Sequence, residues 1–116
     1  MPVDARDVAQ LTRVAKALSD PTRLEMVSML ARGRSCCDLP DICTRGVPGN
    51  GLPAGICVCE FQDQFGLGQS RTSYHLRVLR EAGLVKEETR GKWTFYELDR
   101  ETLGGAMDAL QGLVGR

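Results

Sequence analysis

Residues 57–98 read CVCEFQDQFGLGQSRTSYHLRVLREAGLVKEETRGKWTFYEL, and this stretch decides the fold. The apolar spacing predicts a short helix over about Cys57–Phe65, then a Gly-Leu-Gly turn at 66–68. A second helix is expected over Ser70–Ala82, with Gly83 as its left-handed C-terminal residue. Two helices joined by a short glycine-containing turn, the second rich in arginines and hydroxyl groups, form a helix-turn-helix pattern.

A β-hairpin is predicted directly after this pattern. The runs 84–89 and 92–98 flank Arg90-Gly91, and the second run is rich in aromatic and β-branched residues. A helix-turn-helix followed by a hairpin is a winged helix. Because the wing tip of such a fold lies near DNA, Arg90 and Lys92 are expected to contact the phosphate backbone or the minor groove.

Two helices are predicted before the winged helix and one after it. The first spans 4–18, and the second starts at Pro21 with Asp20 as its N-cap and stops at Gly33. The last begins at about Arg100 and carries a continuous apolar stripe. The predicted order is α-α-α-α-β-β-α, a mainly α fold with a β-hairpin wing. Because the last helix of this small domain is so apolar, we expect a homodimer formed through the first and C-terminal helices.

Length and charge limit the class of protein. The chain has 116 residues and a formal net charge of zero, which predicts one domain over 1–116 and excludes a surface that is basic throughout. The charge is sorted, because 35–68 has one basic residue against four acids and 69–92 has six basic residues against three acids. Charges interrupt the N-terminus, so no export signal is expected, and no apolar run is long enough to cross a bilayer. We expect a cytoplasmic protein without a membrane partner.

All five cysteines lie close together in the sequence. Cys36, Cys37 and Cys43 fall in a cysteine-, glycine- and proline-rich loop predicted at about 35–56, and Cys57 and Cys59 follow it. A reducing cytoplasm and an odd number of thiols argue against a disulfide framework. Thiolates are instead ligands for soft ions. No nucleophile–base pair or phosphate-binding loop is found, so an enzyme is not expected.

The thiols suit several kinds of chemistry. Trivalent arsenic or antimony needs three thiolates in a pyramid, whereas Cd(II), Zn(II) or Pb(II) are alternative guests, zinc preferring four ligands. A thiol redox switch is a third alternative. One of the pair can also be a small buried core residue. Residues two apart on a regular helix point about 200° away from each other, so Cys57 and Cys59 can share an ion only if their turn is not regular helix.

The second helix of the pattern supplies the residues expected to bind DNA. Its N-terminal end enters the major groove, where glutamine, arginine and hydroxyl groups contact bases and phosphates. His75 is expected either to pack or to lie beside a phosphate, and no catalytic partner is found for it. Together with the wing tip, the predicted DNA-binding residues are Gln69, Ser70, Arg71, Thr72, Ser73, Tyr74, His75, Arg77, Arg90 and Lys92.

Three motifs carry a family resemblance. ALSDPTRLEMVSML, SRTSYHLRVLREAGLV and TRGKWTFYEL resemble the ArsR/SmtB family of metal- and metalloid-responsive repressors, and CVCE is similar to the motif of its arsenical- and cadmium-sensing members. The resemblance covers about residues 17–98. It implies a winged-helix repressor that leaves its palindromic operator when Cys57 and Cys59 bind an inducer, with no permanent cofactor. Arsenical repressors often carry a third cysteine where this chain has Gln62, so the third ligand is expected from the loop: Cys37, or alternatively Cys36 or Cys43.

Overall fold

The computed structural model describes residues 5–33 and 55–115. They form α1 (Ala5–Leu18), α2 (Pro21–Arg32), β1 (Ile56–Cys57), α4 (Val58–Phe65), α5 (Gln69–Glu81), β2 (Val85–Arg90), β3 (Trp93–Leu98) and α6 (Arg100–Val114). The predicted order of helices, hairpin and final helix is confirmed. The loop predicted at about 35–56 lies outside the described residues as far as position 54, and so do Cys36, Cys37 and Cys43.

The predicted helix ends follow their local signals. Asp20 caps α2 and accepts from the backbone N–H groups of Thr22 and Arg23, while Pro21 occupies the first helical position. Gly33 ends α2 with φ 82°, and Gly83 follows α5 with φ 79°, both in the left-handed region. These short-range signals therefore act in the folded chain as the sequence predicts.

The sheet has one strand more than the predicted hairpin. Its order is β1-β3-β2, and all neighbours are antiparallel. Ile56 pairs with Tyr96 and Cys57 with Phe95, while β2 pairs with β3 from Val85–Leu98 to Arg90–Trp93. A Cβ on Gly55 would lie 2.4 Å from the carbonyl oxygen of Tyr96, so only glycine permits this close approach of β1 to β3.

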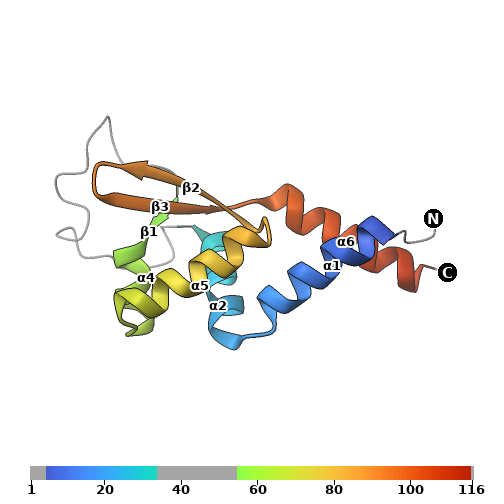
Figure 1. The fold of residues 1–116 in the computed structure, drawn as a ribbon, viewed down its shortest axis with the longest axis horizontal. Coiled ribbons are helices and arrows are strands. Elements are labelled where there is room, and N and C mark those ends of the chain that lie inside the picture. The colour runs from blue at the N-terminus through green and yellow to red at the C-terminus, as the bar shows by residue number, and fades with distance from the viewer. Residues whose placement is uncertain (1–4, 34–54, 116) are drawn as a thin grey trace.

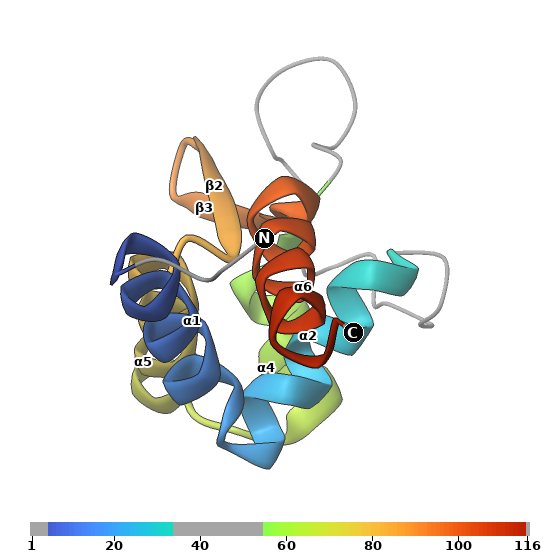
Figure 2. The same cartoon turned by 90° about the vertical axis from the view of Figure 1, so that its right-hand side faces the viewer.

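The helices and the sheet enclose one hydrophobic core. Several elements contribute fully buried side chains to it: Met26 from α2, Phe61 from α4, Leu76 and Leu79 from α5, and Leu84 from the turn after α5. Figure 1 shows the wing at one end of the molecule, with α5 beside it, and α1 alongside α6 at the other end. Figure 2 looks along the long axis with α6 in front, next to α1. The helix-turn-helix and the wing therefore share one end, away from the α1–α6 pair.

Candidate functional site: a thiol pair beside a nucleic-acid interface

The sulfur atoms of Cys57 and Cys59 lie 3.2 Å apart. Cys57 ends β1 and is the N-cap of α4, with extended backbone angles of φ −75° and ψ 150°, whereas Cys59 lies in the first helical turn. The predicted helix began at Cys57, but the observed one begins at Val58. Since Cys57 stands outside the helix, the two side chains converge without any unwinding of α4.

This separation suits a single soft ion. With metal–sulfur bonds of about 2.3 Å, two thiolates lie about 3.8 Å apart on a tetrahedral ion and about 3.3 Å apart when the bonds meet near a right angle. The observed 3.2 Å agrees with the right-angle value and is shorter than the tetrahedral one. The pair can therefore provide two of the ligands for either geometry after small side-chain rotations.

The two sulfurs differ in their surroundings. Cys57 is buried, and Cys59 is half-buried. Cys59 is disulfide-bonded in this structure. Reduction of this bond is required before Cys59 can act as a thiolate ligand. Within residues 5–33 and 55–115, no three His, Cys, Asp or Glu side chains gather as a metal site.

A cavity of about 270 Å³ connects the thiol pair with the elements expected to bind DNA. Cys57 and Cys59 line it from the β1–α4 junction. Gln69 and Ser73 line it from α5, and wing residues including Lys92 complete its wall. A ligand held by the thiols would therefore lie beside side chains predicted to contact DNA.

Most of the predicted DNA-binding residues lie on one exposed surface of α5 and the wing. Arg90 is half-buried and forms a 2.8 Å ion pair with Glu88. Lys92 lies 5.3 Å over the Trp93 ring, and Arg77 lies 5.7 Å over the Tyr74 ring, both in cation–π geometry. The exposed members of the set are Gln69, Ser70, Arg71, Ser73, Tyr74, Arg77 and Lys92.

Thr72 and His75, two of the predicted DNA-binding residues, lie on the inner side of α5. Thr72 is fully buried, and its hydroxyl donates to the carbonyl of Gly68 at 2.9 Å. His75 is only 7% exposed and contacts Arg23 of α2. Thr72 lies four positions before Leu76, and His75 lies four positions before Leu79. Residues four apart share one face of a helix, so these two side chains turn inward with the core leucines. The burial of His75 is consistent with the packing alternative.

Arg23 ties α1, α2 and α5 together. Its Nε donates to the carbonyl of Ala17 at 2.7 Å, and its Nη1 lies 3.1 Å from Nδ1 of His75. A guanidinium only donates, so we assign Nδ1 of His75 as the acceptor and the imidazole as neutral. Burial lowers the pKa of His75; the Asp20 carboxylate opposes this effect, and the positive charges of Arg23 and Arg71 add to it. Protonation of His75 would therefore oppose this contact.

A second polar group links α5 to the wing. Arg80 of α5 pairs with Glu87 of β2 at 2.9 Å, and Glu87 lies directly opposite Tyr96 in the sheet. Burial and the interaction with Glu87 raise the pKa of Tyr96 to about 12. The sequence alone does not indicate that Arg80 pairs with Glu87 or that Arg23 contacts His75. The ALSDPTRLEMVSML motif contains Arg23, but only the folded chain reveals its partners.

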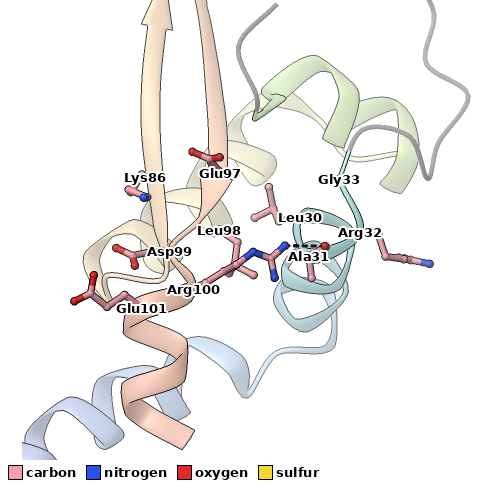
Figure 3. Close-up of a pocket in the computed structure, with 10 residues that line it drawn as sticks. All are labelled: Leu30, Ala31, Arg32, Gly33, Lys86, Glu97, Leu98, Asp99, Arg100 and Glu101. Carbon is pink, nitrogen blue, oxygen red and sulfur yellow. Dashed lines mark hydrogen bonds between the residues drawn. The ribbon is translucent and has the colours of Figure 1, made fainter.

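A larger cavity of about 410 Å³ lies away from the thiol pair, between the end of α2, β3 and the start of α6. Figure 3 shows the Arg100 side chain crossing it to donate to the carbonyl of Ala31 at 2.9 Å. Of the described residues, neither Cys57 nor Cys59 lines it, and none of the predicted DNA-binding residues does. The arrangement joins α6 to the last turn of α2, which supports a structural role for Arg100.

These features define a class of protein. A helix-turn-helix whose second helix exposes polar and basic side chains, followed by a β-hairpin, is a winged-helix DNA-binding domain. Residues 56–87 match the family described as "Bacterial regulatory protein, arsR family". An "Arsenical resistance operon repressor" of Bacillus subtilis is 34% identical over 92 residues, 79% of this chain and 69% of the relative. The chain belongs to the ArsR family.

A further curated protein and a solved structure are similar to this chain. The "Cadmium resistance transcriptional regulatory protein CadC homolog" of Staphylococcus aureus is 29% identical over 91 residues, which cover 78% of this chain and 59% of the relative. A crystal structure of an ArsR family transcriptional regulator has the same fold, with a TM-score of 0.68 at 19% identity over 91% of this chain and 88% of that one. Membership of the ArsR family makes the protein a DNA-binding transcriptional repressor and not an enzyme. Among the described residues, no helix is long and apolar enough to span a membrane.

Proposed function

We propose that this protein is a homodimeric repressor that releases a palindromic operator when trivalent arsenic or antimony binds Cys57, Cys59 and a third cysteine. The 3.2 Å separation of the two sulfurs at the start of the helix-turn-helix carries the proposal. Cys37 is the favoured third ligand, and Cys36 and Cys43 are the alternatives. All three lie outside the described residues.

The choice of inducer rests on the number and type of ligands. Three thiolates satisfy a pyramidal As(III) or Sb(III) centre, and the described part of the chain places no histidine beside Cys57 or Cys59. The relative from B. subtilis, an arsenical resistance repressor, supports arsenic. The cadmium-resistance relative keeps divalent Cd(II), Zn(II) and Pb(II) as the alternative, which a fourth ligand would favour.

The DNA side of the proposal uses the exposed surface of α5 and the wing. Gln69, Ser70, Arg71 and Ser73 lie in its first turns, where a helix inserted into the major groove meets base edges and phosphates. Lys92 and Arg90 extend the contact at the wing tip. Two such surfaces related by a two-fold axis would bind two half-sites, so a palindromic operator follows from a dimer.

The dimer is proposed from unpartnered apolar side chains at the opposite end of the molecule. One face of α6 carries Met107 and the residues three, six and seven positions after it. The helix α6 lies next to α1. That face needs a covering partner, and a second copy of the chain supplies the same face in return. The exposed apolar residues of α1 and α6 are Val8, Met107, Leu110, Leu113 and Val114, each 51–77% exposed.

Coupling between the two functions is proposed to act through β1 and the shared cavity. Cys57 pairs with Phe95 of the wing strand, so a displacement of Cys57 is passed to β3 through the sheet. The inducer would also lie beside Gln69 and Ser73, which line the same cavity. The sequence required that the turn holding both cysteines is not regular helix, and the position of Cys57 outside α4 meets that requirement without unwinding.

A thiol redox switch is a second candidate, and one observation favours it. Cys59 is disulfide-bonded in this structure. Oxidation would then remove a ligand and restrain the start of α4 without any ion. The same assay separates the two candidates.

The test is operator binding measured by fluorescence anisotropy with reduced protein. The duplex is first selected from a random-sequence library by the reduced protein. Arsenite should release the duplex from the wild type. Cys57→Ser and Cys59→Ser should each bind the duplex as the wild type does. Each variant should respond to arsenite only at a concentration roughly 100-fold higher or more, since each loses one thiolate. Hydrogen peroxide, cadmium and zinc are added in parallel. Release by peroxide but not by arsenite would reject the metalloid proposal, and loss of DNA binding in both variants would mark the cysteines as core residues.

A further inference from the structure

The separation of the two sulfurs depends on where α4 begins. A helix that started one residue earlier would include both Cys57 and Cys59, and their side chains would then point about 200° apart. In this structure Val58 is the first helical residue, and Cys57 remains extended as the N-cap. Whatever holds Cys57 out of the helix therefore also holds the two thiols together.

Glu60 provides part of that restraint, together with the pairing of Cys57 with Phe95 in the sheet. The backbone N–H of Cys57 donates to Oε2 of Glu60 at 3.2 Å. The two residues occupy the N-cap and N3 positions, the arrangement in which an N3 side chain reaches back to fix the chain before a helix. The carboxylate also lies in the first turn, where the helix dipole favours a negative charge.

The burial of Glu60 sets it apart from an ordinary cap. The residue is fully buried, whereas the Asp20 and Asp99 caps of α2 and α6 are only half-buried. Removing a carboxylate from water is costly unless hydrogen bonds compensate. A buried carboxylate that bonds to the backbone of the first thiol residue is well placed to restrict Cys57 to one conformation.

We infer that Glu60 is a positioning residue of the inducer site, holding Cys57 outside α4 so that the two sulfurs are arranged for one ion before it arrives. The inference rests on the proposed function of the thiol pair. Glu60 acts through Cys57 and is not itself a ligand. Without the restraint, the chain would divide its time between converging and diverging thiols, and the apparent affinity would fall by the fraction lost.

The test compares Glu60→Gln, which keeps an oxygen acceptor of the same reach, with Glu60→Met, which keeps the volume and removes the acceptor. Arsenite is titrated into reduced, DNA-free protein and followed by sulfur-to-arsenic charge-transfer absorbance. Glu60→Met should bind arsenite roughly 3- to 30-fold more weakly, the range expected for loss of a helix cap. Glu60→Gln should stay within about twofold of wild type, because glutamine also serves at N3.

Asp99→Ala is the matched control, because it removes the half-buried cap of α6, where Asp99 accepts from Thr102 N–H. This variant should lose thermal stability but keep its arsenite affinity. Operator affinity without arsenite should be unchanged in Glu60→Gln and Glu60→Met. Equal arsenite affinity in all four proteins, or equal loss in Glu60→Gln and Glu60→Met, would overturn the inference.

If Glu60→Met does not fold, amide hydrogen exchange keeps the inference testable. The Cys57 amide should be protected in both the wild type and Glu60→Gln, and exchange at the rate of an open amide in folded wild type would overturn it. A wild-type protein that does not bind arsenite at all would instead reject the proposed function.

Discussion

Replacing Arg23 with methionine is predicted to loosen the attachment of the recognition helix α5. In the wild type, the guanidinium donates to the carbonyl of Ala17 at 2.7 Å and lies 3.1 Å from Nδ1 of His75. Methionine keeps much of the apolar stem but can donate neither hydrogen bond. The change therefore leaves the buried His75 nitrogen without this donor and separates α5 from the α1–α2 turn.

The expected loss follows from these two contacts. A hydrogen bond from a charged group contributes about 1.5–3 kcal/mol to stability. Arg23 is half-buried, so the lower end of that range applies to each bond. The free energy of unfolding should fall by about 3 kcal/mol, which lowers the urea midpoint by roughly 1–3 M at ordinary slopes.

The assay is urea unfolding followed by circular dichroism, at one fixed protein concentration because a dimer is expected. Arg13→Met is the control, since Arg13 is exposed on α1 and surface changes usually stay within about 0.5 kcal/mol. The single histidine also gives an NMR titration, and the His75 pKa should rise in Arg23→Met because a positive charge is removed. A loss no greater than that of Arg13→Met, with an unchanged His75 pKa, would refute the reasoning.

Two further predictions concern assembly and pH. Leu110→Glu places a charge on the exposed apolar face of α6 and should raise the dissociation constant of the dimer by more than about tenfold. Sedimentation velocity measures this constant, and operator binding should weaken as a consequence. A dimer as tight as that of the wild type would place the interface elsewhere. Because the folded state lowers the pKa of His75 below 6.5, the unfolded chain takes up the proton first as pH falls, so the stability from neutral His75 is present above about pH 6.5 and is lost below it. Urea midpoints between pH 7.5 and 5 should fall more in wild type than in His75→Gln, and parallel profiles would contradict this.

The positions of the predicted elements came from short-range signals. Asp20-Pro21 starts α2, Gly33 ends it, and the glycine after α5 takes the expected left-handed conformation. Each signal acts within one turn of the chain, so it can be recognised without knowing the fold. The two-residue strand β1 has no such signal, because it is too short to show alternation and its partner Tyr96 lies 40 positions away.

For the candidate site, too, some features follow from the sequence and others only from the fold. The sequence by itself determined the residue types: two cysteines at the start of a helix-turn-helix, and polar and basic residues on its second helix. Only the tertiary structure decided which of them face one another. The pairing of β1 with β3 and the buried Glu60 place Cys57 outside α4, and the core packing of α5 turns Thr72 and His75 inward. Composition specifies the chemistry that is available, whereas the direction of each side chain depends on contacts between segments far apart in the sequence.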